Sequence, residues 1–314
     1  MDIITSIEKI DTIKESVVTI GNFDGLHKGH QVLIKKASEY ANINGITSVV
    51  FTFKNHPVNY FRPNSIKNII PNEEKIEILK HLNIDLMINI PFDETVTKIS
   101  AHDFVKKILL DKLKAKKIIV GNDFTFARNK EGNIELLQEL SKQYGFILEI
   151  VDPVKIDDIR VSSTYIRKLI SSGNVEDVHK YLGRNYKLSG EVIHAKKLGR
   201  TIGFPTANIS INKDMIIPKR GIYATKVYVN EKVYYGATNI GYNPTVNGEN
   251  LSIETNILEF DKDIYGQIIT IEFLERIRDE KKFNGIEELK TQLQKDTKYV
   301  YKKYICKNEK VVIE

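Results

Sequence analysis

The chain has almost no cysteine, because Cys306 is the single one among 314 residues. This shortage excludes an intrachain disulfide and a zinc site built on cysteines. The sequence also lacks an apolar run of the roughly 18 residues that a membrane-spanning helix needs, and its first residues have no basic stretch like that of a secretory signal. We therefore expect a cytoplasmic protein with no membrane partner.

Strong charge bias is absent as well. The net charge is +6 at pH 7, and most of it falls after residue 183. A basic second part is compatible with nucleic-acid binding, but its lysines are scattered along the chain instead of following one helix face. Anionic nucleotide substrates explain the charge equally well. We expect no nucleic-acid partner, and a nucleic-acid or regulatory binding protein is kept as the competing class.

What the chain does contain is a glycine-punctuated turn in the stretch VVTIGNFDGLHKGH, residues 17–30. A short apolar strand ends at Gly21, and Gly25 and Gly29 let the backbone approach a ligand closely. A helix that starts near Lys28 would present unpaired amides to a phosphate. A G-x-x-x-x-G-K-[ST] sequence is missing near this stretch, so a Walker-type γ-phosphate site is not indicated.

Two histidines, His27 and His30, end the same stretch. Their spacing places both on one side of the expected helix, where they could act as further donors to the phosphate. The alternatives are surface or capping histidines, or a metal-binding pair. The glycine context favours the phosphate site.

Up to about residue 183, short β-branched runs alternate with helical stretches, which predicts a parallel sheet with helices on both faces. Ligands of such sheets bind beyond the carboxyl ends of the strands, and the turn at Gly21 follows the first predicted strand. The predicted strands are 17–20, 48–53, 85–90, 117–120 and 146–150. The predicted helices are 30–42, 72–82, 101–113 and 133–144, and Asn72 and Ser100 are expected to cap two of them.

After residue 183 the pattern changes to period-two runs separated by turns, which predicts a small antiparallel β barrel. The predicted strands are 187–194, 221–230, 232–238, 251–258 and 267–273, with turns at 229–232 and 241–244. A last helix, 286–304, is expected to pack on the barrel through Ile286, Leu289, Leu293, Thr297 and Val300. We place the domain boundary near Gly183–Arg184.

Three further segments of the first part carry candidate site residues. His56-Pro57 and Gly121-Asn122-Asp123-Phe124 follow predicted strands, where a binding crevice is lined. The third segment is VSSTYIR, residues 161–167. Its Ser162 or Ser163 could simply cap a helix; alternatively its amides and hydroxyls hold a triphosphate, and Arg167 neutralises the leaving pyrophosphate.

The second part has its own glycine-rich stretch, GRTIGFPTAN, residues 199–208. The Thr206 hydroxyl and the Asn208 amide oxygen lie two residues apart at a strand start, so they share one face. Such hard oxygen ligands suit Mg²⁺. The alternative is an ordinary turn followed by an edge strand.

Taken together and in order, these motifs resemble those of known families. The first stretch resembles the (T/S)-x-G-x-F-D-x-x-H-x-G-H signature of nucleotidyltransferases that attack at the α-phosphate, and its matching residues are Thr19, Gly21, Phe23, Asp24, His27, Gly29 and His30. With V-S-S-T-x-I-R it resembles the adenylyltransferase half of bifunctional bacterial riboflavin kinase/FAD synthetases. G-x-x-x-G-x-P-T-A-N resembles the ATP·Mg²⁺ motif of riboflavin kinases, and residues 251–265 and 278–283 match that family further along.

The resemblance implies a fold and two activities. The fold is a Rossmann-like nucleotidyltransferase domain (1–183), which makes FAD from FMN and ATP, followed by a small antiparallel β-barrel domain with a C-terminal helix (184–314), which makes FMN from riboflavin and ATP. Mg²⁺ is the implied cofactor, and no oligomeric state is indicated. The alternative is a monofunctional enzyme, with one half decayed or meant for another acceptor.

The resemblance also implies roles for individual residues. The catalytic residues are Glu254, His27, His30 and Arg167. In the adenylyltransferase domain, ATP contacts Gly21, Phe23, Asp24, Gly29, Ser163 and Thr164, and the flavin contacts His56, Asn122 and Asp123. In the kinase domain, ATP contacts Gly199, Gly203, Pro205, Thr206 and Asn208, the metal contacts Thr206 and Asn208, and the flavin contacts Arg278, Glu280 and Phe283.

One position departs from the family pattern. Asn256 stands where many relatives have a histidine, two residues after Glu254, and no role is assigned to it. Glu254 matches the general-base position. Because a carboxylate is a weak base, its help would come mostly from placement against the hydroxyl; the alternative is a solvent-facing strand carboxylate.

Overall fold

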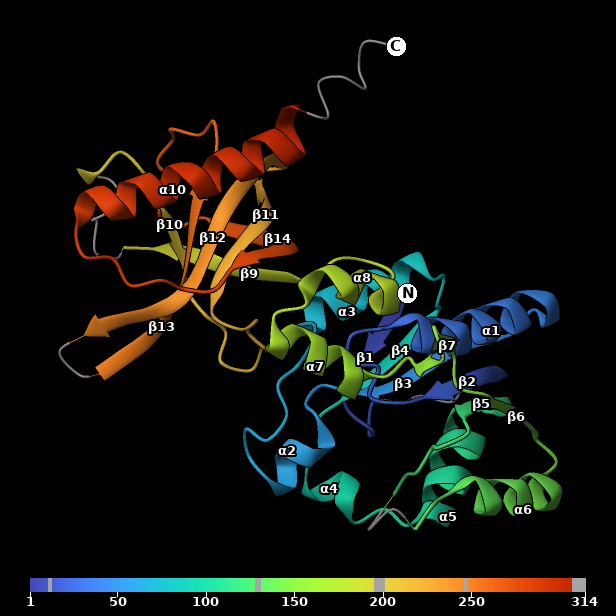
Figure 1. Ribbon diagram of the computed structural model, residues 1–314. Coiled ribbons are helices and arrows are strands. Elements are labelled where there is room, and N and C mark those ends of the chain that lie inside the picture. Colours follow the sequence, from blue (N-terminus) through green and yellow to red (C-terminus); the bar gives the residue numbers. More distant parts are fainter. Residues whose placement is uncertain (11–12, 128–130, 195–200, 246–247, 307–314) are drawn as a thin grey trace, which may run out of the picture. The chain divides into compact units, whose positions relative to one another are not determined.

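The computed structural model describes residues 1–10, 13–127, 131–194, 201–245 and 248–306. The chain divides into two compact units, Met1–Ser163 and Thr164–Glu314, which are described separately (Figure 1). The predicted boundary near Gly183–Arg184 lies further along the chain, after the second helix of the second unit.

The first unit contains a parallel sheet with the strand order β1-β4-β3-β2-β5-β6. Its strands are β1 (Asp2–Ile4), β2 (Ser16–Ile20), β3 (Thr47–Phe53), β4 (Leu86–Ile90), β5 (Ala115–Gly121) and β6 (Ile147–Val151). All five neighbouring pairs are parallel, so the predicted sheet is confirmed. The chain builds outward from β2 in both directions, which places the topological switch point between β2 and β5.

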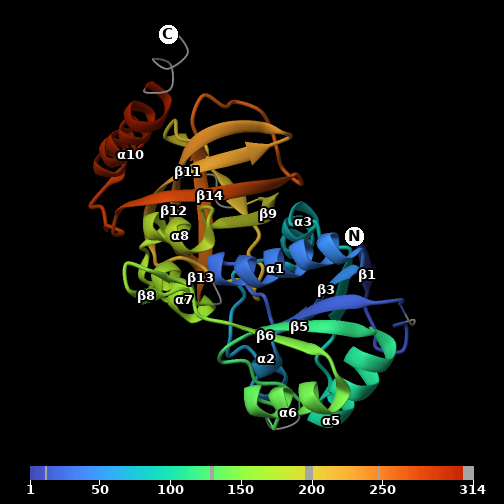
Figure 2. The ribbon, with the colours of Figure 1, turned by 90° about the vertical axis from the view of Figure 1, so that its right-hand side faces the viewer.

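Helices cover both faces of this sheet. They are α1 (Lys28–Asn44), α2 (Pro57–Phe61), α3 (Asn72–His81), α4 (Glu94–Thr97), α5 (Ala101–Asp103), the π-helix η1 (Phe104–Lys112) and α6 (Ile134–Tyr144). Figure 2 shows α1 and α3 on one side of the sheet and α5 and α6 on the other. The four predicted helices are therefore present, although the third one continues as a π-helix after Asp103.

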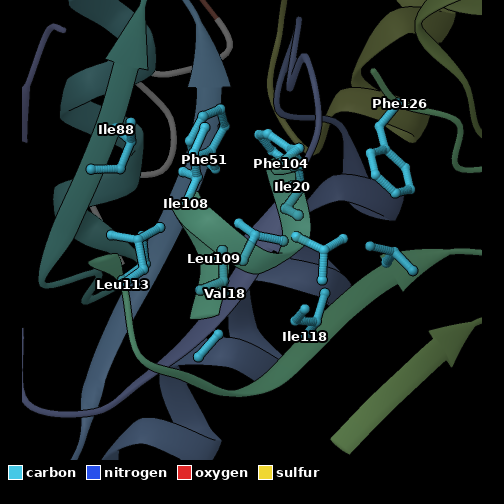
Figure 3. Close-up of a cluster of buried hydrophobic side chains, with 14 of the residues drawn as sticks. Val18, Ile20, Phe51, Ile88, Phe104, Ile108, Leu109, Leu113, Ile118 and Phe126 are labelled. Carbon is cyan, nitrogen blue, oxygen red and sulfur yellow. The ribbon is translucent and has the colours of Figure 1, made fainter. Parts of the chain in front are cut away.

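The π-helix side of the sheet holds a large apolar cluster, shown in Figure 3. Val18 and Ile20 of β2 point into it, whereas Val17 and Thr19, which alternate with them along the strand, are buried on the opposite face. Burial on both faces explains why the strands appear in the sequence as short continuous apolar runs. Phe104 of η1 belongs to this cluster and faces Phe51 edge-on at 5.2 Å between ring centroids.

Of the two expected caps, one is confirmed. The Ser100 hydroxyl accepts a hydrogen bond from the Asp103 amide. The expectation for Asn72 is wrong, because the N-cap of α3 is Pro71 and Asn72 is the first helical residue. The Asn72 side-chain amide instead donates to the carbonyl of Lys54 at 2.9 Å, a partner that a local reading of the sequence does not show.

The second unit begins at Thr164, within helix α7 (Ser163–Ser172). It continues with α8 (Val175–Leu182) and a closed barrel of order β10-β13-β12-β11-β14-β9. The strands are β9 (Lys187–Ile193), β10 (Ala207–Ile209), β11 (Gly221–Val229), β12 (Lys232–Thr245), β13 (Gly248–Ile257) and β14 (Ile268–Arg278). The predicted barrel is confirmed. Since β10 pairs with both β9 and β13, the edge-strand alternative for residues 206–208 is wrong.

The predicted turn at residues 241–244 is also wrong. Strand β12 runs through it and stays paired with β13 as far as Thr245 and Gly248. The glycine at position 241 has a packing reason instead of a turn: the Glu280 carboxylate lies so close to its backbone that a Cβ would be 2.2 Å from Oε1.

The last helix, α10 (Ile286–Val300), continues as the π-helix η3 (Tyr301–Ile305). Val300 is fully buried as expected, but Ile286 is 55% exposed, so the predicted contact face is wrong at its first position. The sequence pattern also missed Asp296, which is buried and forms an ion pair with Arg278 at 2.6 Å. No helix of the described residues is both long and apolar enough to cross a membrane.

A chain of hydroxyl groups connects three strands inside the barrel. Thr225, Thr238 and Thr255 are fully buried, and the Thr238 hydroxyl lies 2.8 Å from each of the other two. Each hydroxyl can therefore satisfy its neighbour in a place that water does not reach.

We expect Thr238→Val to lower the unfolding free energy of the barrel by about 1–3 kcal/mol, because Thr255 loses its hydroxyl partner while the shape is kept. Hydrogen exchange of the barrel strands in increasing urea measures this loss. Thr270→Val is the matched control, since the Thr270 hydroxyl contacts Ser189 at the exposed surface; its effect should stay within about 0.5 kcal/mol. Equal effects of both substitutions would contradict the role of the buried chain.

Candidate functional site

A cavity of about 950 Å³ opens in the first unit. Residues after β2 (Gly21, Asn22) and after β5 (Asn122, Asp123) line it, so it lies at the carboxyl ends of these neighbouring strands, at the switch point. This is where a sheet of this type is expected to bind its ligand. The volume is at the upper end of the range of about 300–1,000 Å³ that is typical of small-molecule sites.

His27 and His30 line this cavity together. His27 is the N-cap of α1, and its Nδ1 accepts a hydrogen bond from the His30 amide at 3.2 Å. The two rings stack with centroids 3.5 Å apart and an interplanar angle of 15°. Because Nδ1 is the acceptor, a neutral His27 carries its proton on Nε2, which is then a donor. The prediction that both histidines lie on one side at a helix start is confirmed.

The residues around the histidines keep this arrangement tight. A Cβ on Gly29 would lie 3.2 Å from atoms of the His27 ring, so the glycine makes room for the capping side chain. The buried Phe23 ring contacts His30 edge-on at 5.2 Å. Phe23 and Gly25 both have positive φ, 48° and 82°, which folds the turn back over the start of α1.

Asp24, predicted to contact ATP, is buried and holds other parts of the chain. Its Oδ1 accepts hydrogen bonds from the amides of Ile69 at 2.9 Å and Ile70 at 3.4 Å. Its carbonyl accepts one from the Ser163 hydroxyl at 2.8 Å. Asp24 therefore ties the turn to two distant segments, and Ser163 lies in the cavity wall.

Asn122 and Asp123 line the cavity as expected, and Asp123 forms an ion pair with Arg160 of β8 at 2.5 Å. Arg160 lies outside the motifs found in the sequence, although it is a cavity residue with a permanent positive charge. The Asp157-Asp158 pair is a sequence signal for a turn just before Arg160, because Asp adopts positive φ more readily than most residues. In the structure both residues have positive φ, 50° and 60°. Two such residues in sequence are typical of a tight hairpin turn, here between β7 (Lys155–Ile156) and β8 (Ile159–Arg160).

The remaining wall is largely apolar and includes several aromatic rings. Phe61 and Phe92 approach each other at 6.0 Å between centroids, and Phe124 stacks on Phe126 at 5.4 Å; all four line the cavity. The cavity thus combines a polar end with apolar walls that suit a flat aromatic ligand.

Three predicted residues are not among those that line this cavity. His56 caps α2 through its Nδ1 and lines a second, water-sized cavity together with Asn22 and Asp24. Thr164 and Arg167 lie on α7 and belong to the second unit, so their contact with ATP stays a prediction.

In the barrel, Glu254 of β13 is registered directly between Asn208 of β10 and Asn239 of β12. Cross-strand partners share a face, so these three residues form one polar row, which we call the Glu254 row. Asn208 is 8% exposed, and its Oδ1 has no hydrogen-bond partner among the described residues. A buried acceptor of this kind is suited to a cation or a donor on a ligand.

The structure connects Asn256 with the loop before β10. Its side-chain amide donates to the Pro205 carbonyl at 2.7 Å, one residue before Thr206. Gly203 in the same loop has a φ of 84°, which favours glycine. Gly199, the first glycine of the motif, lies outside the described residues.

The predicted flavin contacts of the barrel are involved in other interactions. Arg278 is held by Asp296 of α10, with Nη2 and Oδ2 2.6 Å apart. Glu280 lies 3.7 Å from Arg220, and the Phe283 ring lies 5.7 Å from the Lys281 ammonium. Contacts of these three residues with a flavin stay predictions.

A metal site made of His27 and His30 alone stays an alternative. Among the residues that the structure describes, no group of three or more His, Cys, Asp or Glu side chains is placed to hold a metal ion. The Thr206 and Asn208 oxygens are a different type of site, in which phosphates and water supply most ligands.

Comparison with known proteins covers both units. The sequence model of FAD synthetases matches residues 9–165, and that of riboflavin kinases matches residues 182–304. Relatives described as bifunctional riboflavin kinase/FMN adenylyltransferase include one from Haemophilus influenzae, 37% identical over 89% of this chain and 91% of its own length. Another, from Bacillus subtilis, is 38% identical over 90% of each chain.

Among solved structures, a Streptococcus pneumoniae protein described as a macrolide-efflux protein has a TM-score of 0.86 at 32% identity, over 95% of this chain and 97% of that one. With both sequence models matched in order and relatives 37% and 38% identical along most of its length, the chain belongs to the bifunctional riboflavin kinase/FMN adenylyltransferase family.

Proposed function

We propose that the chain phosphorylates riboflavin to FMN with one ATP and then adenylylates FMN to FAD with a second, releasing pyrophosphate. The kinase reaction is assigned to residues 184–314 and the adenylyltransferase reaction to residues 1–183. The observation that carries this proposal is the cavity at the switch point, where a stacked pair of histidines at a helix start meets aromatic walls.

In the adenylyltransferase domain, a phosphate oxygen of FMN attacks the α-phosphorus of ATP, and the bond to the bridging oxygen of pyrophosphate breaks. Negative charge builds up on the α-phosphate oxygens as this happens. Donors fixed beforehand stabilise that charge, and the first turn of α1 supplies them as amides together with His27 and His30. Arg167 is assigned to the leaving pyrophosphate.

The cavity walls explain how the acceptor is held. The aromatic side chains of Phe61, Phe92, Phe124 and Phe126 offer an apolar surface for the isoalloxazine ring. Arg160 is paired with Asp123, and a phosphate group of the substrate can replace this carboxylate, because guanidinium binds both types of anion.

In the barrel, the 5′-hydroxyl of riboflavin attacks the γ-phosphorus of ATP, ADP leaves, and Glu254 accepts the hydroxyl proton. Thr206 and Asn208 fit Mg²⁺, because Oδ1 of Asn208 is a buried acceptor without a hydrogen-bond partner among the described residues and hard oxygen ligands suit this ion. A bound Mg²⁺ would neutralise phosphate charge. Asn256 fixes the Pro205 carbonyl and so sets the position of Thr206.

His30→Ala and Glu254→Ala should separate the two activities, and each variant is the control for the other. We expect His30→Ala to slow conversion of FMN to FAD by about 10²–10³-fold, the usual cost of losing a donor to developing charge, while FMN formation stays unchanged. Glu254→Ala should show the reverse. Chromatography of riboflavin, FMN and FAD over time measures both, and equal loss of both activities in folded His30→Ala would refute two separate sites.

Asn208→Ala should raise the Mg²⁺ concentration needed for half-maximal FMN formation by about 10–100-fold, as loss of metal-site contacts does elsewhere. Conversion of FMN to FAD by the same protein should keep its Mg²⁺ dependence. Asn230→Ala is the control, because the Asn230 amide contacts Gln267 at an exposed turn. An unchanged Mg²⁺ requirement in Asn208→Ala would exclude Asn208 from the metal site.

A further inference from the structure

Lys75 of α3 is a buried lysine that none of the assigned roles uses. Its exposure is only 6%, although lysine is almost never fully buried without a partner. A burial of this kind costs free energy unless the ammonium group makes specific bonds. The neighbouring lysine of the same helix, Lys80, shows the usual behaviour, since it is half exposed and pairs with Glu77.

The bonds of Lys75 lead to the wall of the large cavity. Its Nζ donates to the carbonyls of Asn22 and Phe53, both at 3.2 Å. Asn22 lies in the turn between β2 and the histidines, Phe53 ends β3, and both residues line the cavity. The Thr52 hydroxyl donates to the same Asn22 carbonyl at 3.0 Å, so this carbonyl is held from two sides.

The surroundings of Lys75 contain one compensating charge. Burial lowers the pKa of Lys75 to about 8, and the nearby carboxylate of Asp24 partly opposes this effect. Lys75, Asp24, Lys54 and His56 line the water-sized cavity behind the turn, and they are the titratable groups that face one another there. Asp24 accepts the Ile69 and Ile70 amides, just before α3.

We propose that Lys75 is a positioning residue of the adenylyltransferase site, whose ammonium fixes the Asn22 and Phe53 carbonyls and adds positive charge behind the turn that faces the triphosphate. This inference rests on the proposed function of the first domain. The ammonium acts through the carbonyl of Asn22, which directly precedes Phe23, the residue that packs against His30. An apolar side chain could fill the same volume but would leave both carbonyls without this donor.

A charged Lys75 makes stronger hydrogen bonds than a neutral amine and favours an anionic ligand nearby. ATP binding to the first domain should therefore weaken as pH rises through about 8, where the pKa of Lys75 lies. Stability should change in the opposite direction. Since the unfolded chain binds this proton up to its ordinary pKa of 10.5, folding is favoured as pH rises from about 8 to that value.

The test uses the full chain and measures kcat and KM for ATP of FAD formation from FMN between pH 6.5 and 9.5. In Lys75→Met we expect kcat/KM to fall by about 10–100-fold at pH 7, the range found when a supporting hydrogen bond is lost. Lys75→Arg keeps a permanent charge, so it should restore at least part of the activity and remove the rise in KM near pH 8. Lys80→Met is the matched control and should change neither kcat/KM at pH 7 nor the rise in KM near pH 8.

Hydrogen exchange of strands β2 to β5 reports on folding of the first domain in each variant, and the kinase reaction reports on folding of the barrel. The proposal would be overturned if folded Lys75→Met adenylylated FMN as fast as the wild type. It would also be overturned if the KM for ATP of the wild type did not rise near pH 8, or if this rise persisted in Lys75→Arg. If Lys75→Met does not fold, the wild-type pH profile alone decides. A wild-type protein that forms no FAD from FMN would refute the proposed function itself, and not only the role of Lys75.

Discussion

The hydrogen bond from the His30 amide to Nδ1 of His27 is the constraint on which the first domain's site depends. It ends the turn after β2, starts α1, fixes which ring nitrogen of His27 donates, and brings the two imidazoles into a stack. The start of a helix and two oriented rings are thereby built from one cap. Gly29 favours this arrangement, because a Cβ there would lie 3.2 Å from the His27 ring, closer than an ordinary van der Waals contact.

Local sequence was sufficient to predict most of the architecture. The strands 17–20 and 48–53 are buried on both faces, so their mostly apolar runs identify them, and Ser100 caps α5 through its own side chain as expected. The barrel followed from its alternating runs, and the histidine site from glycines and histidines only a few residues apart. In each case the decisive neighbours are close in the chain.

The features that could not be predicted all depend on partners far along the sequence. The Asn72 side chain bonds the Lys54 carbonyl instead of capping α3. Strand β12 continues through residues 241–244, which look like a turn, because β13 pairs with it there. Arg278 matched a flavin-side motif, yet its guanidinium is bound by Asp296 of the last helix. Lys75 looked like an ordinary helix lysine, and only the fold brings it under the carbonyls of Asn22 and Phe53.

Asp24 connects segments that the ribosome makes at different times. Its carboxylate accepts hydrogen bonds from amides 45 and 46 residues further along the chain. Its carbonyl accepts one from the Ser163 hydroxyl, 139 residues further along, at the last residue of the first unit. The turn therefore lacks its full set of hydrogen bonds during most of the synthesis of this unit. It is completed just as the unit itself is, before any barrel strand has been translated, so the nucleotide site matures in step with the domain that carries it.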